Sequence, residues 1–115
     1  MLLGQEWLAE EFDLFVKEVT KEITVKAGQK CTAVRRILVP EALIDEVQSA
    51  ISARLASTKI GNPAEEGVRM GPLATTLQAE RVRASVEELS KSQRIVFGNL
   101  DHLDIIGASA KPEAF

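Results

Sequence analysis

The single cysteine of this sequence, Cys31, is the residue best suited to covalent chemistry. Nucleophilic catalysis by a thiol requires a thiolate that a substrate can reach. Cys31 follows Gly28, which favours a turn, and the basic residues Lys26 and Lys30 flank it. This setting predicts a candidate nucleophile. Two alternatives stay open: a small buried hydrophobic residue, or a redox sensor, although the chain has no second cysteine to resolve an oxidised thiol.

Other catalytic patterns are absent from the sequence. It contains no Gly-x-Ser-x-Gly nucleophile motif, no Gly-x-Gly-x-x-Gly motif and no Gly-Lys-Ser/Thr phosphate-binding loop. The one histidine, His102, lies in a polar stretch that is typical of a surface histidine. The acidic residues Glu65, Glu66, Glu87 and Glu88 are expected to be solvated. With one cysteine and one histidine the chain has no cluster for zinc, so we expect no metal.

Length and composition indicate one small globular domain. The chain has 115 residues, 45% hydrophobic and 27% charged, with a formal net charge of -3. Its apolar runs are far shorter than the roughly 20 residues of a membrane-spanning helix. The N-terminus lacks the pattern of a signal peptide, and no basic stripe suggests a nucleic-acid surface. We therefore expect a cytoplasmic protein that binds neither membranes nor nucleic acid.

Hydrophobic spacing predicts the elements that carry Cys31. Apolar residues at intervals of three and four predict an amphipathic helix over 8–27, with Gly28 as its stop. β-Branched and aliphatic residues predict a buried strand over 34–39. A second helix is expected to begin at Pro40 and to fade at 57–58.

The second half of the chain has weaker patterns. Repeated glycine and proline residues predict an ordered loop over 60–74. Thr75 and Gln78 match a capping box and predict a helix to about Lys91, followed by a short strand over 94–97. The order helix-strand-helix-loop-helix-strand fits an α/β fold with parallel strands. Because two strands make a poor sheet, we expect the chain to belong to something larger or to assemble with copies of itself.

The stretch 15–33, which ends in Ala-Gly-Gln-Lys-Cys-Thr-Ala, resembles the active-site segment of the aldehyde dehydrogenase superfamily, in which a helix runs into a Gly-Gln-x-Cys turn. Three further landmarks keep the family's order: Leu38-Val39-Pro40, Gly61-Asn62-Pro63 and Met70-Gly71-Pro72-Leu73. The residues around Cys31, together with 66–71, are most similar to the aldehyde dehydrogenase of bacterial phenylacetate degradation. The resemblance implies that residues 1–115 are a single partial catalytic domain of α/β class, without a dinucleotide-binding domain.

The resemblance also implies a mechanism. Cys31 would attack an aldehyde carbonyl to give a thiohemiacetal, hydride would pass to NAD or NADP, and water would release an acid. The backbone N–H of Cys31 would help to hold the oxyanion, while Gly28, Gln29 and Thr32 would shape the turn around the thiol. In the phenylacetate branch the aldehyde would be a CoA-linked semialdehyde.

Several parts of the family pattern are missing from the sequence. It has no Glu-Leu-Gly-Gly segment for the general base, no asparagine for the oxyanion and no Glu-x-Phe-Gly-Pro segment. We therefore expect a fragment that by itself holds no cofactor and does not oxidise aldehydes. Uncovered helix faces and sheet edges predict a homo-oligomer, with a dimer as the default. The alternative hypothesis is a non-catalytic α/β module that self-associates or docks to a partner.

Overall fold

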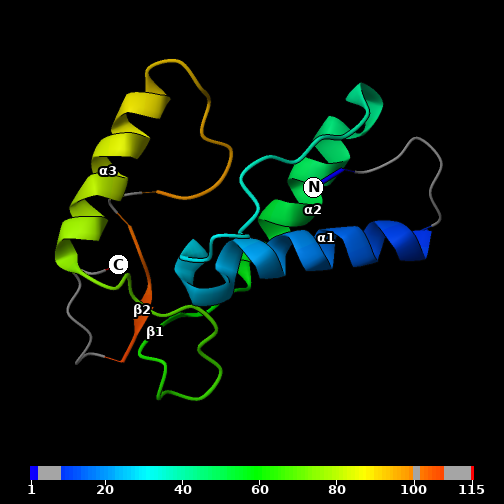
Figure 1. Cartoon of the computed structure of the whole chain (residues 1–115). Coiled ribbons are helices and arrows are strands. Elements are labelled where there is room, and N and C mark those ends of the chain that lie inside the picture. Colours follow the sequence, from blue (N-terminus) through cyan, green and yellow to red (C-terminus); the bar gives the residue numbers. More distant parts are fainter. Residues whose placement is uncertain (3–8, 100–101, 108–114) are drawn as a thin grey trace. The chain divides into compact units, whose positions relative to one another are not determined.

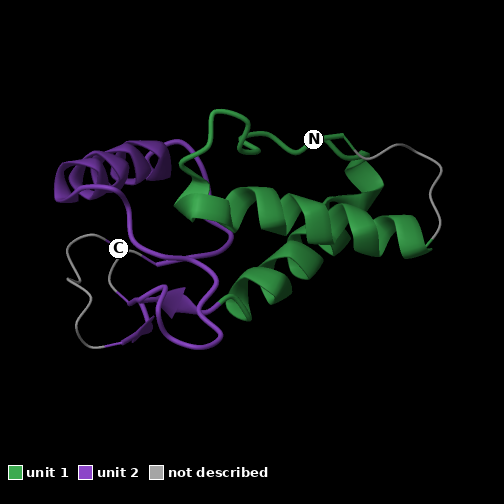
Figure 2. Cartoon of the chain, turned by 60° about the horizontal axis from the view of Figure 1, so that its bottom comes forward, with its two compact units in different colours: residues 1–58 green, residues 59–115 purple. Residues whose placement is uncertain are grey.

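The computed structural model describes residues 1–2, 9–99, 102–107 and 115. The chain divides into two compact units, unit 1 with residues 1–58 and unit 2 with residues 59–115 (Figure 2). Helices and one pair of short parallel strands form these units, so the predicted α/β class is confirmed. The expectation of a single partial catalytic domain over 1–115 stays a prediction.

Two helices form the core of unit 1 (Figure 1). α1 (Ala9–Thr24) and α2 (Ile44–Ala56) pack through apolar stripes, and a 3-10 turn (Glu41–Leu43) precedes α2. The buried cluster consists of Phe12, Phe15, Val16, Val19, Val47 and Ile51. Both predicted helices are therefore confirmed, although Leu8 lies outside the described residues and α1 ends at Thr24.

The predicted strand over 34–39 is wrong as a regular element. Only Leu38 forms a bridge there, a parallel one to Leu2, and its N–H donates to the carbonyl of Met1 at 2.9 Å. A strand needs a neighbouring backbone over several residues, whatever its β-propensity. In the described part of unit 1, only the first two residues of the chain supply that backbone.

Backbone pairing organises part of unit 2. β1 (Ile60–Gly61) and β2 (Ile105–Ile106) are parallel, with Ile60 opposite Ile105 and Gly61 opposite Ile106. The N–H of Gly61 also donates to the carbonyl of Met70 at 3.0 Å. The predicted loop over 60–74 therefore contains a short strand at its start, and its remainder has no helix or strand of its own.

The predicted strand over 94–97 is also wrong. These residues form no strand, and Ile95, Val96 and Phe97 are 49%, 53% and 45% exposed. Their apolar side chains favour a strand locally, but no described backbone segment pairs with them as strands do. The observed order of regular elements is helix, helix, strand, helix, strand.

The third predicted helix is confirmed as α3 (Thr76–Ser90). Thr75 caps it, because the side-chain oxygen of Thr75 accepts a hydrogen bond from the N–H of Gln78 at 3.2 Å. Ala79 is the one buried residue of α3. The apolar residues Leu77, Val82 and Leu89 are exposed, so α3 differs from α1 in leaving much of its apolar stripe uncovered.

Candidate active site

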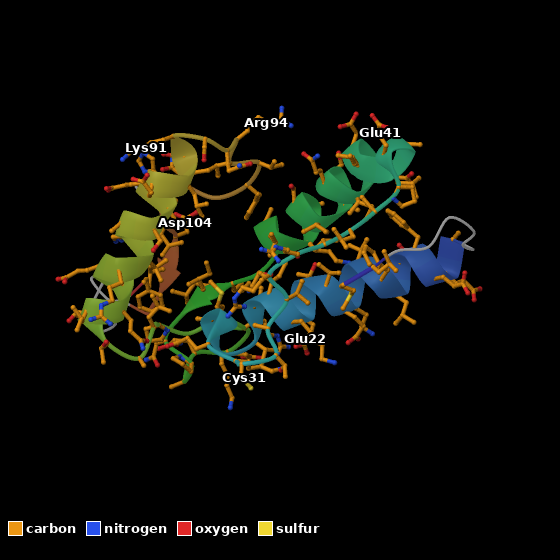
Figure 3. The ribbon with its side chains drawn as sticks, turned by 45° about the horizontal axis from the view of Figure 1, so that its top comes forward. Glu22, Cys31, Glu41, Lys91, Arg94 and Asp104 are labelled. Atoms are coloured by element: carbon orange, nitrogen blue, oxygen red, sulfur yellow. The ribbon has the colours of Figure 1, made fainter. Side chains whose placement is uncertain are left out.

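Cys31 lies on the turn that follows α1, where its thiol is free and exposed (Figure 3). The alternative of a buried small hydrophobic residue is therefore wrong. α1, which leads into the turn, is packed into the core of unit 1, where Val19 is 0% exposed. The hydroxyls of Thr20 and Thr24 donate to carbonyls four residues earlier, at 2.8 and 2.9 Å.

A left-handed stretch of backbone links α1 to Cys31. In the 3-10 segment Val25–Gly28, Lys26 and Ala27 both have a φ of 52°, and Gly28 has a φ of 72°. A Cβ at Gly28 would lie 3.3 Å from the carbonyl oxygen of Ile23. Glycine suits this position because it adopts positive φ without a steric penalty. The predicted helix over 8–27 therefore extends too far. α1 ends at Thr24, and Gly28 ends the 3-10 segment four residues further on, after the non-helical Lys26 and Ala27.

Hydrogen bonds to two backbone carbonyls hold this stretch. Gln29 donates to the carbonyl of Lys26 from its own N–H at 3.0 Å and from its side-chain Nε2 at 2.9 Å. The Arg35 guanidinium donates to the carbonyl of Gly28 at 3.0 Å. The turn is thus tied to itself and to the segment that follows Cys31.

An ion pair ties the turn back to α1. Lys30 Nζ lies 2.7 Å from Glu22 Oε2, and the two side chains are 28% and 24% exposed. The sequence pointed to Lys30 only as a basic neighbour of the thiol and did not reveal its partner. In one continuous helix or strand, residues eight apart would be separated by roughly 12 or 26 Å along the axis, so the course of the turn brings these charges together.

The residues predicted around the nucleophile do share one turn. Gly28 is half-buried, while Gln29, Cys31 and Thr32 are exposed. Gln29 stabilises the turn through the carbonyl of Lys26, as described above. The catalytic role of Cys31 and the oxyanion role of its N–H stay predictions.

The other candidate groups lie apart from this turn in the sequence and are exposed. This applies to Glu65, Glu66, Glu87, Glu88 and His102. Among the described residues, no group of three or more histidine, cysteine or acidic side chains could hold a metal ion. None of the helices within the described ranges is both long enough and apolar enough to cross a membrane.

The expectation that this chain by itself holds no cofactor stays a prediction. The glycines of the chain follow no phosphate-loop spacing. We therefore assign no cofactor contact to this chain.

Comparison with known proteins identifies the family. The profile of the aldehyde dehydrogenase family matches residues 9–112. The chain belongs to the aldehyde dehydrogenase family. The resemblance drawn from the Gly-Gln-Lys-Cys turn and its downstream landmarks is confirmed at this level.

Two relatives are similar to this chain over most of its length. The chain is 44% identical over 105 residues to 3,4-dehydroadipyl-CoA semialdehyde dehydrogenase of Aromatoleum evansii, an alignment that covers 91% of this chain and 20% of the relative. It is 34% identical over 100 residues to a putative aldehyde dehydrogenase family 7 member A1 homolog of Dictyostelium discoideum, covering 86% of this chain and 19% of the relative. The chain thus spans about one fifth of the length of these relatives.

A solved structure supports the fold. The crystal structure of a variant of aldehyde dehydrogenase C from Pseudomonas syringae, in complex with NAD+ and octanal, has a TM-score of 0.74 to this chain at 24% identity. The match covers 85% of this chain and 20% of that structure. The predicted fold class, an α/β part of the aldehyde dehydrogenase fold, is confirmed by this likeness.

Proposed function

We propose that this chain is the nucleophile segment of an NAD(P)-dependent aldehyde dehydrogenase that oxidises a CoA-linked semialdehyde, with Cys31 as the catalytic nucleophile. The observation that carries the proposal is the free, exposed thiol of Cys31 on a Gly-Gln-Lys-Cys turn. Membership of the aldehyde dehydrogenase family supports it. The 44% identity to an enzyme named for a CoA semialdehyde supports the substrate class. The resemblance of the residues around Cys31 and of 66–71 supports a place in phenylacetate degradation.

The proposed first step is an addition to the aldehyde. The Cys31 thiolate attacks the carbonyl carbon, a C–S bond forms, and the electron pair of the C=O bond moves to oxygen. The backbone N–H of Cys31 donates to this oxyanion, while Gly28, Gln29 and Thr32 keep the turn in shape. NAD or NADP bound elsewhere in the parent enzyme would supply the hydride acceptor. Loss of hydride from carbon would leave a thioester on Cys31, which water would hydrolyse to the acid and the free thiol.

A chimera tests this role. Residues 9–112 of this chain replace the aligned segment of the Aromatoleum evansii enzyme, and oxidation of its CoA-linked semialdehyde is measured. We expect the chimera to be active and Cys31→Ala to lower kcat by at least about a thousandfold, because the nucleophile is lost. A chimera that folds and binds NAD+ but is inactive, or a Cys31→Ala variant that stays active, would contradict the proposal.

By itself, the 115-residue chain is proposed to be a cytoplasmic homo-oligomer without dehydrogenase activity. Exposed apolar side chains on α3, such as Leu77, Val82 and Leu89, support self-association. Sedimentation should give the mass of a dimer or a larger oligomer, and a panel of aldehydes with NAD+ or NADP+ should give no reduced cofactor. A monomer would contradict self-association, and activity that disappears in Cys31→Ala would contradict the expected inactivity.

A further inference from the structure

Two long side chains, those of Lys30 and Arg35, make polar contacts that bridge the Cys31 turn. Lys30 reaches back to Glu22 across the 3-10 segment, with 2.7 Å between Nζ and Oε2. Arg35 reaches back across Cys31 itself to the carbonyl of Gly28, at 3.0 Å. Glu22 and Cys31 accordingly lie at the same end of α1 (Figure 3). The turn is therefore restrained on both sides of the thiol.

The backbone of this turn needs restraint. Lys26 and Ala27 both have a φ of 52°, a left-handed conformation that is unfavourable for a residue with a side chain. The two hydrogen bonds from Gln29 to Lys26 are local and move with the turn. Lys30 adds a bond from the turn to Glu22 on α1, and Arg35 adds a bond to the turn from the segment that follows it. If they were lost, the strained backbone would be free to relax and shift the residues that follow it.

Burial makes the ion pair at the turn stronger than the others in the described part of the chain. The Lys30–Glu22 side chains are 28% and 24% exposed. In the pair Lys21–Glu18, also on α1, the corresponding values are 57% and 37%. A pair that is less exposed is less screened by water and salt, so it contributes more.

We propose that Glu22, Lys30 and Arg35 are positioning residues that fix the thiol and the backbone N–H of Cys31 for attack on an aldehyde. The catalytic consequence rests on the proposed function, because Cys31 must be the nucleophile. The restraint of the turn by these three residues does not depend on the proposed function. It can be measured in the 115-residue chain alone.

Hydrogen exchange of the backbone amides over 26–32 tests the restraint. We expect Lys30→Gln, Glu22→Gln and Arg35→Gln each to speed this exchange about tenfold, since each removes a charge-assisted hydrogen bond that opposes local opening. The double variant Glu22→Lys with Lys30→Glu restores the pair in reverse and should restore slow exchange. Glu18→Gln, which breaks the more exposed pair on the same helix, is the matched control and should leave these amides unchanged.

A catalytic readout separates positioning from general stability. In the chimera described above, Lys30→Gln should lower kcat about tenfold with KM for NAD+ unchanged, and the reversed pair should recover most of it. Amide exchange that is unaffected by Lys30→Gln would overturn the restraint. Faster exchange with unchanged kcat would overturn positioning. If the unmutated chimera is inactive, the proposed function fails, while the exchange data still decide the restraint. If Lys30→Gln does not fold, the Arg35→Gln variant and the reversed pair decide whether the restraint exists.

Discussion

Units 1 and 2 are stabilised in different ways. In unit 1, α1 and α2 bury a contiguous cluster of aromatic and aliphatic side chains that includes Phe15, Val19 and Ile51. In unit 2, Gly61 and Ala79 are the only buried residues among those that the structure describes. Backbone hydrogen bonds from β1 to β2 and to Met70 supply much of the order there.

This difference shows where each unit is sensitive to mutation. A core made of side chains is sensitive to volume and charge at its centre. A structure made by close backbone approach is sensitive at its glycines, where an added Cβ has no room. The candidate nucleophile follows the helix with the larger core, so the base of its turn should stay in place even where unit 2 opens.

The largest effect is expected from a charge placed in the core of unit 1. Val19 is 0% exposed, so Val19→Asp should destabilise unit 1 by at least about 3 kcal/mol, because an unpaired carboxylate would lose its water. The matched variant Val82→Asp lies on α3, where Val82 is 47% exposed in the single chain. At concentrations low enough to keep the chain monomeric, it should cost less than about 0.5 kcal/mol. Urea unfolding followed by the amide signals of each unit measures both.

An equal loss of stability in Val19→Asp and Val82→Asp would contradict this contrast. It would mean that the apolar face of α3 is shielded from water to the same degree as the core of unit 1. Size-exclusion chromatography of the Val82→Asp variant would then show whether self-association supplies that cover.

The next largest effect is expected from Gly61→Ala in unit 2. A Cβ at Gly61 would clash with the backbone of Ile106, above all with its carbonyl oxygen. We expect β1 and β2 to separate, at a cost of about 2–3 kcal/mol, with loss of the bond from the Asn62 N–H to that carbonyl. Hydrogen exchange of the Asn62 amide reports the loss.

Gly98→Ala is the control for the loss of glycine itself. Gly98 has a φ of 99° but nothing within 4 Å of an added Cβ, so its substitution carries conformational strain without a clash. It should leave the Asn62 amide protected. Fast exchange of that amide in Gly98→Ala, or slow exchange in Gly61→Ala, would show that the close approach does not hold the strands together.

The sequence predicts the two helices of unit 1 better than the paired strands of unit 2, because a helix depends on local residue spacing and a strand depends on a distant partner. Apolar residues at intervals of three and four identify α1 and α2, because a helix satisfies its own backbone and needs only one face covered. A strand depends on a partner that local sequence does not specify. The ranges 34–39 and 94–97 have β-favouring residues without forming strands, whereas the two-residue β1 lies in a segment expected to be a loop.

The candidate site, too, could be predicted from the sequence only in part. The Gly-Gln-Lys-Cys segment could be recognised from sequence because its residue types and their order are local. The ion pair of Lys30 with Glu22 and the hydrogen bond from Arg35 to Gly28 could not, because both depend on the course of a left-handed turn. No residue spacing marks the consecutive positive φ values of Lys26 and Ala27.

A moderate effect is expected at the cap of α3. Thr75→Ala removes the oxygen that accepts a hydrogen bond from the Gln78 N–H and should cost about 1 kcal/mol. Ser85→Ala, in the interior of the same helix, should be neutral or slightly stabilising, because alanine has the higher helix propensity. Amide exchange in the first turn of α3 distinguishes the two. Equal protection in both variants would mean that the cap contributes nothing.

The smallest effect is expected for the exposed ion pair of unit 2. Lys91 and Glu88 are 69% and 74% exposed, so Glu88→Gln should cost less than about 0.5 kcal/mol, and added salt should reduce even that difference. Glu22→Gln in unit 1 removes a pair that is only 28% and 24% exposed and should cost more, with less response to salt. Urea unfolding of both variants at low and high salt measures the contrast. If the two substitutions cost the same at both salt concentrations, burial does not set the strength of these pairs. The restraint at the Cys31 turn would then have to come from other bonds, such as those of Arg35 and Gln29.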